Sequence, residues 1–457
     1  METQTKINVS QRVYDSELGS FQWGIIVLCS LCLIMDGFDV QAMGYVAPVL
    51  IREWGVPNSA LGPVFSAALV GVLIGSLGCS MLADRFGRRP MLIAGSLYFA
   101  VLTLITAQAN TINQMLAIRF IAGIGLGGMM PNATALVGEY SPKKSRIIIL
   151  MIVGTGFTAG AALGGFVAAW LIPLFGWRSV FYFGGVIPLV IAALMFRYLP
   201  ESMQYLVLRG KSQATIRKWL TRMEPHAPPP ESAEFVVAEE KLKGAAAAHL
   251  FREGRAATTL LLWVVNFMNL LNLYFLSSWI PTVVRDAGYT TRMAVLAGTM
   301  VQLGGTIGPF VTTRFINRFG FVPTLFVSFL CASLSISAIG QPGLSAALLF
   351  TAIFIAGWCV VGGQPGINSL AALFYPTYLR STGIGWGLGI GRIGAIVGPF
   401  VGGQLMALHW TNRELFYAAA VPAFVSAVVT FSLRFVMKLP EPEPAALRQA
   451  AANAAAH

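Results

Sequence analysis

Two aspartates inside an apolar stretch are the most chemically suggestive residues of the chain. Asp36 and Asp39 lie within residues 22–47, a run long enough to cross a bilayer as a helix. A carboxylate in such a span is costly, so acids there commonly mark an ion or proton path. Their spacing of three puts both on one side of a helix, with Gly37 between them to admit a close neighbour. We expect both acids to carry protons; the alternative is that the span ends at Met35 and both lie in an outer loop.

Two arginines also fall inside apolar runs. Arg119 lies roughly 9 Å from the outer end of residues 113–137, at a depth close to that of the aspartates. It can pair with an aspartate if the two spans adjoin, or otherwise extend its side chain to the membrane interface. Arg392 lies near the middle of residues 383–408, where a lone guanidinium needs an anion, and its planar fork suits a carboxylate. We expect Arg119 to act with the aspartates in proton coupling and Arg392 to bind substrate.

Further side chains are candidates for a binding site beside Arg392. Two are aromatic and offer ring faces: Trp386 and Trp358. Three asparagines repeat at every third position of one apolar run: Asn266, Asn269 and Asn272. We expect the two tryptophans, Asn266 and Asn269 to contribute to substrate binding. The alternatives are core packing for the tryptophans and hydrogen bonding between helices for the asparagines.

The composition places these residues in a membrane. Of the 457 residues, 56% are hydrophobic and only 11% are charged, whereas soluble proteins carry about 25% charged residues. Hydropathy predicts twelve membrane-spanning helices, six on either side of a polar segment. We expect the spans at approximately 22–47, 60–82, 90–109, 113–137, 147–172, 179–199, 258–280, 290–313, 322–340, 345–370, 383–408 and 413–437.

The net charge of +12 indicates topology and no nucleic-acid partner. On this assignment, 24 of the 31 Lys and Arg lie on one side of the membrane, as expected when both termini are cytoplasmic. Residues 1–21 and 200–257 are then a cytoplasmic N-terminal segment and central loop, and residues 438–457 a cytoplasmic tail without regular structure. The scattered histidines and the cysteines in apolar runs indicate neither a metal site nor a redox centre.

The two halves, residues 22–199 and 258–437, repeat each other. Two loops recur with offsets of 233 and 234 residues: residues 83–89 as 316–320, and residues 140–146 as 374–380. Two independent loops at nearly the same offset make chance an unlikely explanation. A parallel repeat of six helices is the architecture of the major facilitator superfamily, with the binding site between the halves near mid-membrane. We therefore expect an all-α membrane protein with twelve transmembrane helices in two pseudo-symmetric six-helix halves.

The repeated loops carry charges that are candidates for opening and closing the protein. In the first loop, the candidates for a conformational latch are Asp84, Arg85, Gly87 and Arg88. Asp84 can meet backbone amides or arginines at a helix end, or it can be plain charge that sets topology. The second copy has Asn317 in place of this acid, so its latch should be weaker. Glu139 and Arg380, in the other pair of loops, are expected to form an inner-gate ion pair, with solvated charge as the alternative.

With these residues in place, the chain resembles the aromatic acid:H⁺ symporters, especially the bacterial 4-hydroxybenzoate and protocatechuate transporters. The resemblance runs from about residue 20 to 437, and its most specific part is Asp36-Gly37-Phe38-Asp39, which matches the family's Asp-Gly-x-Asp. It implies proton-coupled uptake of a small aromatic carboxylate by a monomer in the bacterial inner membrane, driven by the proton gradient without a cofactor. It implies that the functional charges are Asp36, Asp39, Asp84, Arg119, Glu139, Arg380 and Arg392.

Other functions are less consistent with the sequence. A sugar or other organic-anion symporter is the nearest alternative, because residues 200–202 resemble the sugar-porter loop, but a sugar would leave Arg392 without an anion. A drug exporter would carry proline in place of Ala161. A membrane receptor or sensor for aromatic acids needs a signalling domain, for which the central loop leaves little room. An enzyme is not expected, because we find no nucleophile–base pair or metal cluster.

Overall fold

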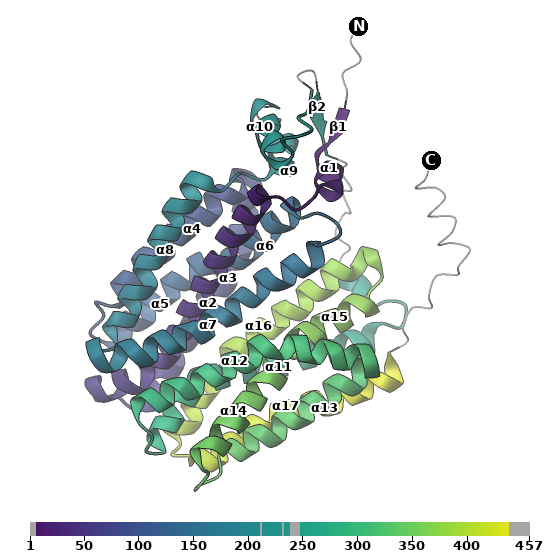
Figure 1. The fold of residues 1–457 in the computed structure, drawn as a ribbon. Helices are drawn as coiled ribbons and strands as arrows, with labels where there is room; N and C mark the ends of the chain where they lie inside the picture. Colours follow the sequence, from purple (N-terminus) through teal and green to yellow (C-terminus); the bar gives the residue numbers. More distant parts are fainter. Residues whose placement is uncertain (1–5, 211–212, 231–232, 238–246, 438–457) are drawn as a thin grey trace.

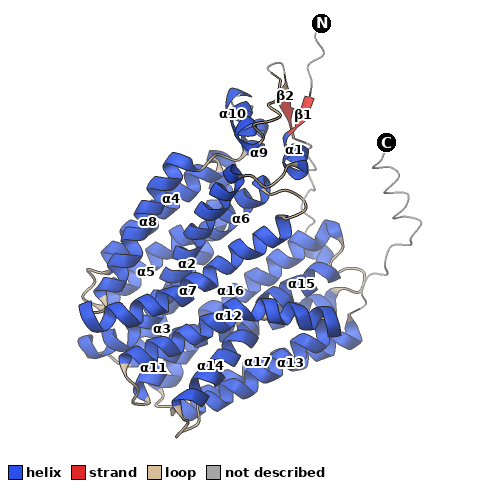
Figure 2. Ribbon diagram, viewed as in Figure 1, coloured by secondary structure: helices blue, strands red, loops and turns tan. Residues whose placement is uncertain are grey.

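The computed structural model describes residues 6–210, 213–230, 233–237 and 247–437, and this part of the chain is almost entirely helical (Figure 2). Within it, 12 helical segments are long and apolar enough to cross a membrane. Helices suit lipid because they satisfy every backbone hydrogen bond internally. The predicted all-α membrane fold with twelve spans is confirmed, while the tail predicted at residues 438–457 lies outside the described residues.

Each half contributes six of these spans (Figure 1). The N half, which holds the first six spans, consists of α2 (Ser20–Trp54), the 3-10 turn η1 (Asn58–Ala60), α3 (Leu61–Phe86), α4 (Arg88–Thr106), α5 (Ile112–Leu126), α6 (Met129–Tyr140), α7 (Arg146–Phe175) and α8 (Arg178–Tyr198). The C half consists of α11 (Ala256–Asp286), α12 (Thr291–Phe319), α13 (Phe321–Ile339), α14 (Ala346–Val360), α15 (Gln364–Phe374), α16 (Thr377–Ala407) and α17 (Asn412–Val436).

The two halves meet through corresponding helices. Helix α7 packs against α12, α3 against α16, and α2 against α11. Helices α3 and α12 are the second spans of their halves, and α7 and α16 are the fifth. The contacts of α7 with α12 and of α16 with α3 are therefore related by the repeat. The predicted pseudo-symmetry of the halves is therefore visible in how they join.

The fourth and tenth spans differ from the single helices expected at 113–137 and 345–370. Each is broken near its middle, between α5 and α6 and between α14 and α15. Two glycines lie at each break, Gly127 and Gly128 in the N half and Gly362 and Gly363 in the C half. Glycine is a poor helix former, which is why the breaks occur there.

Short elements cover one end of the N half (Figure 1). They are β1 (Lys6–Asn8), α1 (Val9–Asp15), α9 (Met203–Leu208), α10 (Gln213–Met223) and β2 (Glu234–Val236), while η2 (Ala247–Phe251) precedes α11. Strands β1 and β2 pair in parallel, and Arg12 Nε lies 2.9 Å from Glu224 Oε2. The described parts of the predicted N-terminal segment and central loop thus fold together on the N half. We call this end of the bundle the termini face and the other end the opposite face.

Candidate functional site

A cavity of about 520 Å³ lies between the two halves, within the range of small-molecule sites. Helices α2, α3, α6 and α7 of the N half and α11, α12, α15 and α16 of the C half contribute to its wall. Most lining side chains are apolar, and among them Asp36 and Arg392 are the charged ones. The cavity therefore brings one acid of the N half and one base of the C half to a common space.

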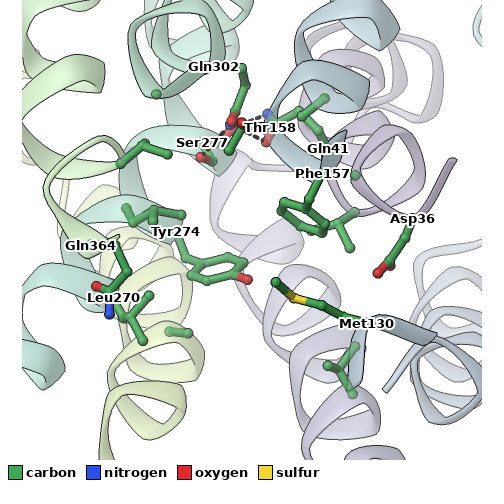
Figure 3. A pocket seen from close by; sticks show the side chains of 18 of the residues that line it. Asp36, Gln41, Met130, Phe157, Thr158, Leu270, Tyr274, Ser277, Gln302 and Gln364 are labelled. Atoms are coloured by element: carbon green, nitrogen blue, oxygen red, sulfur yellow. Dashed lines mark hydrogen bonds between the residues drawn. The ribbon is translucent and has the colours of Figure 1, made fainter. Parts of the chain in front are cut away.

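Three polar residues lie together on the cavity wall (Figure 3), on the side nearer the opposite face. Gln41 Nε2 donates to Ser277 O at 2.6 Å, and Gln302 Nε2 donates to Gln41 Oε1 at 3.1 Å and to Ser277 Oγ at 3.0 Å. Gln41 lies about 7.5 Å further along α2 than Asp36, away from the termini face. Gln41 belongs to the N half, whereas Ser277 and Gln302 belong to the C half. We call these three residues the inter-half cluster.

The cavity is open toward the termini face. Met130 and Met151 line it and are 44% and 43% exposed. Met151 lies in the second turn of α7, which begins at the termini face with Arg146. A ligand therefore has access to Asp36 and Arg392 from this side, while the inter-half cluster blocks the other.

The two predicted proton-carrying acids have different surroundings. The Asp36 side chain points into the cavity, across from the Tyr274 ring (Figure 3), and is 5% exposed. Within the part of the chain that the structure describes, it has no hydrogen-bond or ion-pair partner. Between the acids, an added Cβ at Gly37 would lie 1.8 Å from Phe157 O, so the close neighbour expected at this glycine is the backbone of α7. Asp39 is fully buried and does not line the cavity, so of the two acids expected inside the span only Asp36 faces this space.

Asp39 forms a buried ion pair with Arg119 of α5. Arg119 Nη1 lies 2.8 Å from Asp39 Oδ2 and 2.9 Å from Oδ1, and Nη2 donates to Asp39 O at 3.1 Å. Thr103 Oγ1 donates to the same carboxylate at 3.2 Å. Arg119 therefore does not extend to the interface. Arg119 and Asp39 thus balance each other's charge inside the N half.

A small void separates this ion pair from the cavity. It has about 30 Å³, is lined by Arg119, and shares Leu69 and Tyr274 with the cavity wall. Such a volume exceeds the roughly 10–15 Å³ that a water molecule needs. Between the cavity and the ion pair there is thus only a space large enough for a water molecule.

Arg392 lies on the cavity wall and contacts the other half of the protein. Its Nη1 donates to Ser76 Oγ of α3, and it is close enough to Asp36 for their charges to interact. A guanidinium has five N–H donors in a planar fork, so a bond to Ser76 leaves donors for a carboxylate. The structure places Arg392 where an anion that enters the cavity can reach it.

Trp386 and Trp358 do not line this cavity, and the expectation that they form the substrate site needs correction. Trp386 is 47% exposed and stacks on Trp263 with ring centroids 5.9 Å apart. It lies six residues before Arg392, which is about 120° around the helix. Trp358 Nε1 donates to Thr312 Oγ1 at 3.0 Å beside a separate apolar groove of α12, α13 and α14.

Asn266 and Asn269 also lie behind the cavity wall, where they hold a residue that lines it. Asn269 Nδ2 donates to Gln364 Oε1 at 2.7 Å, and Gln364 Nε2 donates to Asn266 Oδ1 at 2.9 Å. Gln364 is on the cavity wall. The two asparagines hydrogen-bond between helices, the alternative considered from the sequence, and so position this glutamine.

The loop after α3 does not latch the two halves in this structure. Asp84 is exposed, and its backbone carbonyl accepts a hydrogen bond from Arg209 Nη2 at 2.8 Å. The Arg85 guanidinium lies over the Phe86 ring, 5.5 Å from its centroid. Neither contact reaches the C half, so the expected role of Asp84 at a helix end needs correction.

Glu201 has the role expected of Asp84. Its Oε1 accepts from the backbone amides of Arg88 at 2.9 Å and Arg89 at 3.1 Å, in the first turn of α4. Negative charge is favourable there because of the helix dipole. Gly87 has φ 102°, and an added Cβ would lie 2.2 Å from Glu201 Oε2, so only glycine fits this turn.

The predicted Glu139–Arg380 ion pair is not formed in this conformation. Arg88 Nη2 lies 2.8 Å from Glu139 Oε1, and Ser202 Oγ donates to Glu139 Oε2. Arg380 is exposed and has no ion-pair partner among the described residues. The physical reason is that the cavity is open toward the termini face, where both residues lie, so the halves do not meet there.

Sequence reasoning missed most polar residues of the cavity wall. They are Gln41, Tyr274, Ser277, Gln302, Gln364 and Asn368. For the four of these residues that are Gln or Asn, the available signal was a side-chain amide inside an apolar span, where a polar side chain is costly as an aspartate is.

Two six-helix halves around a central cavity that is open to one face and carries two charged side chains are typical of a secondary transporter. The family model of the Major Facilitator Superfamily matches residues 29–345 and 262–456, and the chain belongs to this superfamily, whose members are transporters and not enzymes. It is 39% identical over 424 residues to the 4-hydroxybenzoate transporter PcaK of Pseudomonas putida, covering 92% of this chain and 94% of that protein. It is 37% identical over 423 residues to the gallate transporter of Pseudomonas putida, and this match covers 92% of this chain and 94% of that protein.

The fold also matches a solved structure. The xylose transporter XylE from E. coli, in a partially occluded inward open conformation, superposes with a TM-score of 0.71 at 17% identity. The match covers 93% of this chain and 100% of that chain. At this level of identity the likeness concerns the fold.

Proposed function

We propose that the protein imports aromatic carboxylates of the 4-hydroxybenzoate, benzoate or protocatechuate type, together with protons, across the bacterial inner membrane. The relatives named for 4-hydroxybenzoate and gallate transport support this substrate class. The observation that carries it is the cavity between the halves, which presents one arginine and one unpaired aspartate to the same ligand. The protein acts as a monomer surrounded by lipid and uses the proton gradient without a cofactor.

The termini face is cytoplasmic in this proposal. In the sequence, 24 of the 31 Lys and Arg lie on this side, counting Arg197 and Arg434 at the ends of spans that face it. The conformation described above is then open to the cytoplasm. Import ends in this state, with substrate and proton leaving toward the cell interior.

Arg392 binds the carboxylate of the substrate. An arginine near the middle of the bilayer costs at least about 2.5–3.5 kcal/mol, and a docked anion in an open cavity lowers that cost. The bidentate geometry of guanidinium and carboxylate adds orientation to the attraction of opposite charges. The aromatic rings of Phe157 and Tyr274 in the cavity wall flank the space that the substrate ring occupies.

Asp36, Asp39 and Arg119 couple the proton to this cycle. Asp36 exchanges protons with the cavity, and the adjacent void holds the water that connects the cavity with the Asp39–Arg119 pair. A proton on Asp39 weakens its hold on Arg119 and shifts the preference between the inward and outward states. Coupling requires this kind of differential preference for the two states.

The gates at the two faces alternate during transport. The inter-half cluster closes the outer side in the inward-open state and opens when the halves rock. In the outward-open state, the halves approach at the cytoplasmic side, and Glu139 exchanges Arg88 for Arg380. The two gates are thus closed in opposite states of the cycle.

Uptake of labelled compounds by cells that express the protein tests this function. 4-Hydroxybenzoate, benzoate and protocatechuate should accumulate in these cells faster than in cells without the protein, whereas xylose should not. Cells expressing Arg392→Ala at a matched level provide the control. Equal uptake of the aromatic acids with and without the protein would refute the proposed function.

A further inference from the structure

A connected set of side-chain amides runs from α11 to the cavity wall. Asn269 Nδ2 donates to Gln364 Oε1 at 2.7 Å, and Gln364 Nε2 donates to Asn266 Oδ1 at 2.9 Å and to Asn368 Oδ1 at 3.3 Å. Asn266 and Asn269 are buried, and the Nδ2 of each also donates to a backbone carbonyl. These bonds fix which end of each amide is nitrogen and which is oxygen, so Gln364 and Asn368 have defined orientations.

Gln364 and Asn368 both line the cavity and offer it a donor and an acceptor. Because Asn368 Oδ1 accepts from Gln364, its Nδ2 is the free end, and among the described residues it has no hydrogen-bond partner. Gln364 Oε1 accepts one hydrogen bond, from Asn269, and a carbonyl oxygen has a second lone pair. The wall therefore presents an N–H donor beside an oxygen acceptor.

A phenolic hydroxyl is complementary to this arrangement. It donates one hydrogen bond and accepts another, whereas a carboxylate only accepts and a ring C–H does neither. We propose that Gln364 and Asn368 recognise a ring hydroxyl of the substrate, so that hydroxylated benzoates are preferred over benzoate. This inference rests on the proposed function, because it requires an aromatic carboxylate held in the cavity by Arg392.

The position of these amides in one half suits a specificity site. Asn266, Asn269, Gln364 and Asn368 all belong to the C half, so their geometry persists while the halves rock. The inter-half cluster is the other set of amides on the wall, but its hydrogen bonds join the two halves and must break when the outer side opens. Recognition that is needed in both states therefore falls to Gln364 and Asn368.

Equilibrium binding to the purified full-length protein, measured by calorimetry with 4-hydroxybenzoate and with benzoate, tests this recognition. The parent protein should bind 4-hydroxybenzoate about 2–12-fold more tightly for each hydrogen bond that the hydroxyl makes. Asn368→Leu keeps the side-chain size, removes the donor and leaves Gln364 bonded to Asn266 and Asn269. It should weaken 4-hydroxybenzoate binding by about 2–12-fold and leave benzoate binding unchanged.

Ser369→Ala is the matched control from the same helix. Ser369 is exposed outside the cavity, and its Oγ donates to Pro365 O at 2.8 Å, so its removal should change neither affinity. Equal affinity of the parent for the two ligands would overturn the hydroxyl inference, and so would an equal loss of both in Asn368→Leu. Failure of the parent to bind either ligand would instead refute the proposed function.

Discussion

Replacing Asp39 by asparagine separates the structural role of the buried ion pair from its role in coupling. The Asp39 and Arg119 side chains are 0% and 2% exposed, and the charged atoms lie 2.8 Å apart. Without the carboxylate, Arg119 keeps its charge in a buried site that lacks a counter-charge. Breaking a buried pair in this way costs about 3–5 kcal/mol. Asp36→Asn is the matched control, because Asp36 has no ion-pair partner among the described residues and its change should not lower the free energy of unfolding.

The double variant Asp39→Asn/Arg119→Met completes the test. Methionine removes the unpaired charge, and replacing both members of a buried pair is often neutral for stability. Thermal unfolding of the purified proteins in one detergent should show a lowered transition for Asp39→Asn and a transition near that of the parent for the double variant. Accumulation in liposomes should be abolished in both and in Asp36→Asn, because an amide cannot release a proton. A stable Asp39→Asn variant that accumulates substrate normally would refute this reasoning.

Three further predictions concern substrate binding, the outer gate and the loop after α3. Arg392→Lys should weaken equilibrium binding of 4-hydroxybenzoate, since lysine lacks the planar fork, and Arg392→Ala should weaken it further. Binding by either variant that equals that of the parent would place the substrate carboxylate elsewhere. Gln41→Leu should favour the outward-open state, because it removes two hydrogen bonds between the halves, each worth about 0.5–1.5 kcal/mol. In this variant, a cysteine placed in the cavity should react faster with a thiol reagent added outside. An unchanged reaction rate would contradict this. Glu201→Ala should lower the melting temperature and the transport rate more than Asp84→Asn, because Glu201 accepts backbone amides of α4; equal effects at matched expression would argue against it.

The helices, the repeat and the depth of the charged residues could be predicted from the sequence. Hydropathy and loop repeats depend on local composition, which is enough to locate twelve spans in two halves. The depth of a residue follows from its distance to the span ends, so Asp36 and Arg392 were correctly expected deep in the bundle. Both lie on the cavity wall in the structure.

The rotation of each helix could not be predicted in the same way. In lipid, all faces of a spanning helix are apolar, so hydropathy does not indicate which face meets the cavity. Trp386 is on another side of α16 than Arg392, and Asp39 turns toward α5 while Asp36 turns toward the cavity. The wrong assignment of Asp84 has a similar cause. Glu201 and not Asp84 binds the start of α4, because the packing of the loops decides which acid reaches a helix end.

The most direct test of proton-coupled import is accumulation of labelled 4-hydroxybenzoate in liposomes that contain the purified protein under an imposed pH gradient. Liposomes with Asp39→Asn protein correct for passive entry of the weak acid. The account predicts that parent liposomes, acidic outside, accumulate the substrate above this control and lose it when a protonophore is added. Accumulation that survives the protonophore and follows a sodium gradient would contradict it.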